Sequence, residues 1–76
     1  MTQMKYWRLR LKGDLSPDQV HASLPEHAIN VLRIHKEGGE TQVYFSTAEH
    51  TGAAEARSRG GENAEEVKLD AVTKIG

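Results

Sequence analysis

Every second residue between positions 6 and 12 is aromatic or basic: Tyr6, Arg8, Arg10 and Lys12. The residues between them, Trp7, Leu9 and Leu11, are apolar. Because side chains of a β-strand alternate between its two faces, this pattern predicts a half-buried strand with a basic outer row. Cationic groups beside an aromatic ring can pair with phosphates while a base stacks on the ring. The indicated chemistry is therefore the binding of an anion.

Other reactive side chains show no spacing typical of catalysis or metal binding. His21 and His27 are six residues apart with Pro25 between them, so they lack the i, i+4 spacing of two ligands on one helical face. The chain has no cysteine, which excludes disulfides and thiolate ligands. No glycine motif for nucleotide phosphates is present. We expect no enzymatic activity, no metal and no cofactor.

Length and composition fit one domain that spans residues 1–76. The chain is 37% hydrophobic and has a net charge of -1, so affinity for a polyanion must come from local clustering of charge. The first residues lack the apolar run of a signal peptide, and no apolar stretch approaches the length of a membrane span. We therefore expect a cytoplasmic domain that does not contact membranes.

The residues around Ser16 predict the start of a helix. Ser16 is the candidate N-cap, Pro17 suits the first helical position, and Gln19 completes a capping box. Pro25 ends this helix near Leu24. The first strand, Met4 to Lys12, precedes the helix and stops at Gly13-Asp14.

The remaining elements follow from turn residues and alternation. A strand from Ile29 to Lys36 meets Gly38-Gly39, which predicts a hairpin into a third strand, Thr41 to Ser46. A capping box at Ser46 predicts a second helix through about Ser58, and alternation predicts a last strand from Glu66 to about Lys74.

The order βαββαβ predicts an α+β fold, the ferredoxin-like plait: a four-stranded antiparallel sheet with two helices on one face. The first and third strands are then adjacent at the centre. The predicted core consists of Trp7, Leu9, Leu11, Leu15, Val20, Leu24, Leu32, Ile34, Val43, Phe45, Val67 and Leu69.

The opposite face of the sheet is the predicted binding surface, because it stays open. Six basic residues share it with one acid, Asp70, by alternation; they are Arg8, Arg10, Lys12, Arg33, Lys68 and Lys74. The candidate binding residues for nucleic acid or another anion are Tyr6, Arg8, Arg10, Lys12, Arg33, His35, Tyr44 and Lys68.

This arrangement resembles the RNA-recognition-motif family in strand order and in the exposed aromatic residues. The third strand reads Gly39-Glu40-Thr41-Gln42-Val43-Tyr44-Phe45-Ser46, in which only Tyr44 matches a stacking position. The resemblance implies weak binding of single-stranded nucleic acid. Alternatives are a protein partner, a homodimer formed through outward Val31 and Val72, or a face that is only solvated.

A second resemblance is to ACT-type regulatory domains, which share the βαββαβ order. The segment His27 to Ile34 is similar to the start of their second strand, and Gly13-Asp14 falls at their effector-binding loop. The family's Pro-Gly step is Pro17-Asp18 here. This resemblance implies a dimerisation or regulatory domain that binds a small effector.

Overall fold

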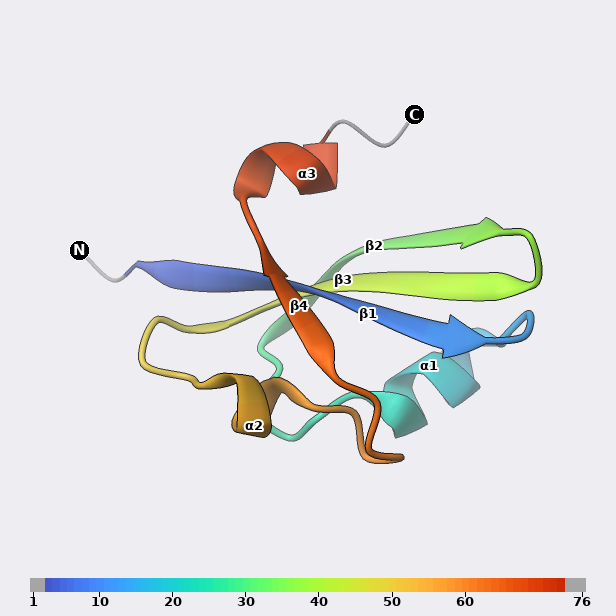
Figure 1. Cartoon of the computed structure of the whole chain (residues 1–76), viewed down its shortest axis with the longest axis horizontal. Helices are drawn as coiled ribbons and strands as arrows, with labels where there is room; N and C mark the ends of the chain where they lie inside the picture. The colour runs from blue at the N-terminus through green and yellow to red at the C-terminus, as the bar shows by residue number, and fades with distance from the viewer. Residues whose placement is uncertain (1–2, 74–76) are drawn as a thin grey trace.

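The protein is described by a computed structural model over residues 3–73. It has an α+β fold with a four-stranded antiparallel sheet and three short helices (Figure 1). The elements are β1 (Met4–Lys12), α1 (Pro17–Ser23), β2 (Asn30–Glu37), β3 (Glu40–Ala48), α2 (Ala53–Ala56), β4 (Ala64–Val67) and α3 (Leu69–Thr73). The strand order is β2-β3-β1-β4, so β1 and β3 are adjacent at the centre, as predicted. In the described part of the chain, no helix is long and apolar enough to cross a membrane.

The core lies between the sheet and the pair α1 and α2, below the sheet in Figure 1. Residues that pair across antiparallel strands point to the same face, and Trp7 pairs with Phe45 while Leu9 pairs with Val43. The predicted core residues that are buried are Trp7, Leu9, Leu11, Val20, Leu24, Val43 and Phe45, with Leu15 partly buried against them. The alternation of β1 and β3 therefore predicts the buried face correctly.

The start of α1 is confirmed in detail. Ser16 Oγ accepts a hydrogen bond from the Gln19 backbone N–H at 3.3 Å, and Gln19 Oε1 accepts one from the Ser16 N–H at 2.8 Å. Pro17 is the first helical residue and Leu24 is the C-cap. Two groups of Arg59 bind the far end: its backbone N–H donates to the Ser23 carbonyl, and its Nε donates to the Leu24 carbonyl, both at 2.9 Å. The local sequence thus starts the helix, and a distant loop holds its end.

Two threonines satisfy polar groups at the edge of the core. Thr41 Oγ1 donates to the Gly13 carbonyl at 2.7 Å and accepts from the Leu15 N–H at 3.1 Å. Thr47 Oγ1 accepts from Trp7 Nε1 at 2.8 Å. Both threonines are fully buried. Each hydroxyl therefore supplies the hydrogen bonds that water would make to these groups in the unfolded chain.

The predicted second helix is much shorter than expected. Ser46 and Thr47 lie in β3 instead of capping a helix, and the helix covers only Ala53–Ala56. The capping-box pattern at Ser46 is misleading because Thr47 is needed inside the sheet as the acceptor for Trp7.

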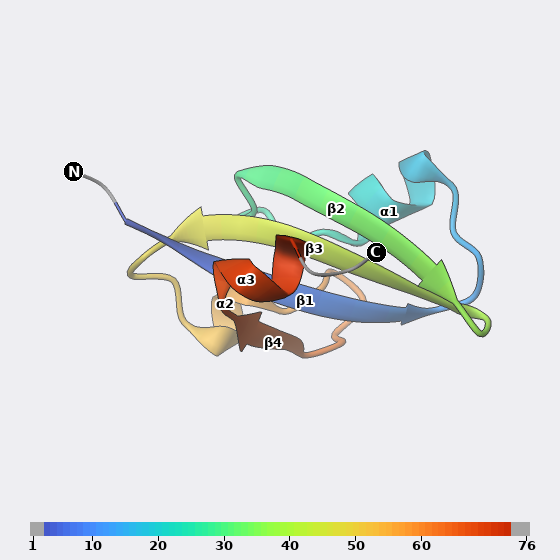
Figure 2. The same cartoon turned by 90° about the horizontal axis from the view of Figure 1, so that it is seen from above.

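The predicted last strand is wrong in length and in register. It ends at Val67, and Leu69–Thr73 form α3 on the face opposite α1 and α2 (Figures 1 and 2). Val67 pairs with Tyr6 and Glu65 with Arg8, so Val67 lies on the α3 side and not in the core. Leu69 is 50% exposed, whereas Val72 is buried. Lys74 lies outside the described residues.

A β-bulge changes which residues of β2 face the core. Val31 pairs with Phe45, but Arg33 pairs with the next residue, Tyr44. The bulge places Val31 against the core, although the alternation predicted that it points away. Leu32 and Ile34, both predicted in the core, are 41% and 40% exposed. A bulge adds one residue to one strand, so Val31 and Leu32 depart from the predicted alternation. Beyond it, Ile34 keeps its predicted face opposite Val43 and is exposed there, on an edge strand of the sheet.

Candidate binding surfaces

The structure brings seven of the eight candidate residues to one face of the sheet. We call this the α3 face, because α3 lies over it (Figure 2). Cross-strand pairs define the arrangement: Arg8, Tyr44 and Arg33 form one row, and Arg10, Gln42 and His35 form the next. Tyr6 and Lys12 belong to the same face of β1. Lys68 follows the end of β4 and is exposed.

Acidic side chains on the α3 face neutralise much of this positive charge. Arg8 Nη2 lies 2.8 Å from Glu65 Oε2. Arg10 Nε lies 3.8 Å from Glu40 Oε1 and 4.0 Å from Glu65 Oε1. His35 Nε2 lies 3.5 Å from Glu37 Oε2. The basic row on β1 is therefore part of a mixed ionic surface.

The Arg8–Glu65 contact has the clearest electrostatic effect on this face. The hydrogen bond to Glu65 raises the pKa of Arg8, and a hydrogen bond with Tyr44 adds to it. Arg8 therefore stays charged, and Glu65 occupies one end of its guanidinium. The Arg8 Nε atom is buried without a hydrogen-bond partner among the described residues, and Ser46 Oγ is also buried without such a partner.

Tyr44 does not offer an open stacking platform. Its side chain is only 2% exposed, and its hydroxyl donates to Gln42 Oε1 at 3.3 Å. Its position on a central strand is as predicted, but the prediction that this face is open is wrong because α3 lies over it (Figures 1 and 2). Tyr6 is half-buried. Only part of the predicted aromatic surface is therefore accessible.

The histidines do not converge. Among residues 3–73, no group of three His, Cys, Asp or Glu side chains could hold a metal ion. His27 Nε2 lies 3.6 Å from Glu55 Oε2, which joins the loop before β2 to α2. The predicted effector loop carries an ion pair as well: Asp14 Oδ1 lies 2.6 Å from Lys36 Nζ. Gly13 adopts φ +93°, a conformation that favours glycine, and so acts as a turn residue.

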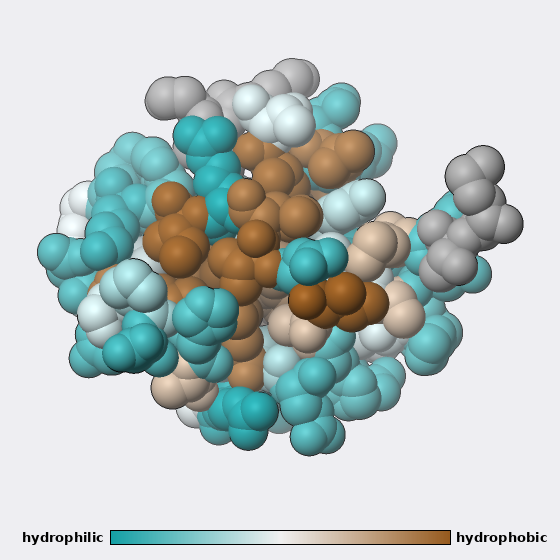
Figure 3. Space-filling view, turned by 180° about the vertical axis from the view of Figure 1, so that it is seen from behind, coloured by the Kyte–Doolittle hydropathy of each residue, from teal (hydrophilic) through white to brown (hydrophobic). Residues whose placement is uncertain are grey.

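A second surface, which alternation did not predict, lies along β2. Figure 3 views the molecule from the β2 side and shows apolar side chains gathered across its middle. Three large apolar residues in or beside β2 are exposed: Ile29 (56%), Leu32 (41%) and Ile34 (40%). Among residues 3–73, β2 pairs only with β3, so one edge of its backbone is also free of strand pairing there. We call this strand with its three exposed apolar residues the β2 edge.

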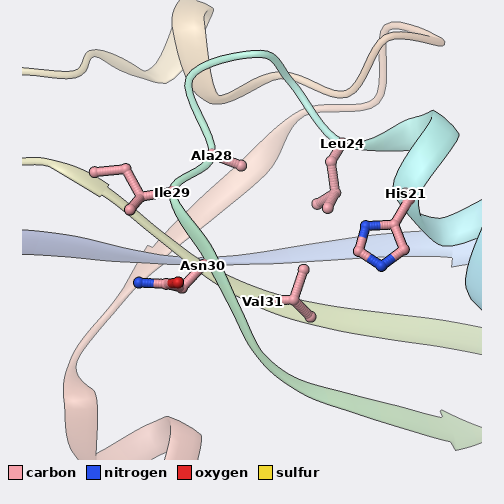
Figure 4. A pocket seen from close by; sticks show the side chains of 6 residues that line it. All are labelled: His21, Leu24, Ala28, Ile29, Asn30 and Val31. Atoms are coloured by element: carbon pink, nitrogen blue, oxygen red, sulfur yellow. The ribbon is translucent and has the colours of Figure 1, made fainter.

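A groove adjoins the β2 edge where β2 approaches α1. It has a volume of about 500 Å³ and is lined by His21, Leu24, Ala28, Ile29, Asn30 and Val31. Figure 4 shows that His21, Leu24 and Val31 point toward one another across it. The groove could accept an apolar side chain beside a strand that pairs with β2.

Sequence reasoning missed two acids of the α3 face, Glu37 and Glu40, for one identifiable reason. Glu37 and Glu40 were assigned to the turn, whereas both pair within the ladder of β2 and β3. Extending the two-residue alternation from His35 and Gln42 by one step reaches both carboxylates. The β2 edge has no comparable signal, because alternation shows neither the bulge at Leu32 nor which strand lies at the edge of the sheet.

Comparison of the chain with protein-family models, curated proteins and solved structures finds no match.

Proposed function

We propose that this chain is a small non-catalytic binding module and that its partner is a protein bound along the β2 edge. One observation carries the proposal: large apolar side chains are exposed on a strand whose outer edge pairs with no other strand in the described part of the chain. An extended segment that adds to such an edge satisfies the backbone groups and covers the apolar side chains. We also infer that the fold is a variant of the ferredoxin-like plait in which the last strand is shortened and followed by α3.

The charge distribution supports a protein partner over single-stranded nucleic acid. The arginines of β1 are close to Glu65 and Glu40, so a phosphate must compete with carboxylates already in place. Tyr44, the predicted stacking residue, is buried. Counterion release and base stacking are the two main sources of affinity for single strands, and both are reduced here.

We therefore expect labelled single-stranded oligonucleotides to bind only weakly, even at low salt. In a titration of isotope-labelled protein, shifts should be small and centred on Arg33 and Lys12, which form no ion pair with another described residue. The control is Glu65→Gln, which frees Arg8 and should increase the affinity. Tight binding by the wild-type chain, with shifts at Tyr6 and Tyr44, would restore the nucleic-acid hypothesis and contradict our choice of partner.

The proposed function is tested by capturing binding proteins and then mapping the surface that they cover. Immobilised wild-type chain and a Glu66→Lys control, altered on β4, should retain the same proteins from a lysate. The double variant Leu32→Glu, Ile34→Glu should lose them, because it places carboxylates on the β2 edge. Hydrogen exchange of the complex with an isolated partner should then show protection on β2. Equal capture by all three baits, or protection confined to α2 and β4, would contradict the proposal.

A further inference from the structure

The exposed surface of the β2 edge is not uniform along the strand. After the bulge, β2 pairs regularly with β3 from Arg33 to Glu37. Ile34 pairs with buried Val43, so Ile34 lies on the α1 side of the sheet. Arg33, His35 and Glu37 pair with Tyr44, Gln42 and Glu40, so they lie on the α3 face. The regular part of the strand thus carries Ile34 and Lys36 on its α1 side and Arg33, His35 and Glu37 on its α3 side.

The charges along this strand are already partly paired within the chain. Lys36 is held by Asp14 at 2.6 Å, and His35 lies beside Glu37 at 3.5 Å. Arg33 has no carboxylate within ion-pair distance among the described residues, whereas Glu37 has a side chain that is 75% exposed. The charges that the edge offers to a partner are therefore positive near its middle and negative at its C-terminal end.

We propose that the protein partner is a second copy of this chain, which pairs with β2 in the antiparallel direction around a two-fold axis at Ile34. This inference rests on the proposed function, since it uses the same edge. In this register Ile34 meets the partner's Ile34 on the α1 side. Arg33 then lies directly opposite the partner's His35 on the α3 face and diagonal to both the partner's Glu37 and the partner's Arg33, within reach of long side chains. The two-fold axis creates the contact between Arg33 and the partner's Glu37 twice.

The charge and the length of the two edge strands favour β2 over β4 as the strand that pairs with a second copy. β4 has only four residues, and its outer positions include Glu65 and Glu66. A short, acidic strand is typical of an edge that resists pairing. β2 has eight residues, and the antiparallel match pairs its exposed Ile34 with itself and brings Arg33 diagonal to the partner's exposed Glu37. Leu32 lies opposite the partner's Lys36, whose aliphatic stem covers part of its exposed apolar surface in the dimer.

The absence of cysteine from the chain makes a precise test available. Directly opposed residues of antiparallel strands have Cα atoms about 4.5–5.5 Å apart, within the range of a disulfide of about 4.4–6.8 Å. We expect Ile34→Cys to form a disulfide-linked dimer under mild oxidation of the folded chain, and not in denaturant. Glu66→Cys, on the β4 edge, is the control and should remain monomeric. Equal cross-linking of the two variants would overturn the inference.

Sedimentation velocity of the wild-type chain, into which no cysteine has been introduced, completes the test. Wild type should pass from monomer to dimer between low and high micromolar concentration, and Ile34→Lys should raise the dissociation constant at least about tenfold. Circular dichroism confirms that the variant is folded. A wild-type monomer at high micromolar concentration would overturn the inference, and capture of a different protein through β2 would then leave the proposed function standing. A dimer unaffected by Ile34→Lys would also overturn it, because the interface would lie elsewhere.

Discussion

Phe45→Ala is expected to destabilise the domain by about 3–5 kcal/mol, the usual range for removing a buried aromatic ring. Phe45 is fully inaccessible and lies between Trp7 of β1 and Val31 of β2. A domain of this size has only about 5–10 kcal/mol of stability in total, so the variant should lose a large fraction of its stability. Urea denaturation followed by circular dichroism measures the loss.

Leu32→Ala is the matched control for this experiment. The sequence pattern places Leu32 in the core, whereas the structure leaves it 41% exposed. Its truncation should therefore cost less than about 1 kcal/mol, well below the cost for a buried leucine. If Leu32→Ala and Phe45→Ala lost similar amounts of stability, the position of the bulge in β2 would be wrong.

Thr41→Val is expected to cost about 2 kcal/mol, although it preserves the shape of a buried side chain. The substitution removes the acceptor for the Leu15 N–H and the donor to the Gly13 carbonyl. Buried groups left without a partner cost about 1–3 kcal/mol each, and this pair is partly accessible to water. The loss should appear in the same urea experiment, and amide exchange at Leu15 should become faster.

Thr41→Ser is the control, because it removes the methyl group and keeps the hydroxyl. It keeps both hydrogen bonds and should retain most of the stability. A Thr41→Val variant as stable as wild type would show that water replaces the threonine, and that the bridge does not fix the loop before α1.

Local signals predicted the first third of the molecule well. The strand Met4–Lys12 has the predicted ends, and the Ser16 capping box forms as expected. The later errors arise where short segments satisfy two patterns. Leu69 and Val72 fit a helical turn, while Val67, Leu69 and Ala71 fit a strand, and such short apolar runs do not separate the two. Whether α3 or a longer β4 forms therefore depends on tertiary contacts and not on the local sequence.

For the binding surfaces, the sequence predicts which side chains of one strand share a face, but not how the strands pair. Alternation correctly groups Arg8 and Arg10 with Tyr44. It gives no information about Glu65, whose pairing with Arg8 depends on the register of β4. The exposure of Leu32 depends on the bulge between Val31 and Arg33, and a bulge is set by how β2 and β3 fit together. Ile34 keeps its predicted face, and its exposure reflects the position of β2 at the edge of the sheet.

The connection between β2 and β3 has a consequence for how the chain folds. Gly38 and Gly39 both adopt positive φ, at +58° and +78°, as in the tight turns whose twist matches that of paired strands. Such a hairpin closes within microseconds, because its ends are close in the chain. By contrast, the contacts between β1 and β4 join residues almost sixty positions apart, for example Arg8 and Glu65. We expect β2 and β3 to associate first, which leaves the β2 edge exposed to other chains before the opposite side of the sheet is complete.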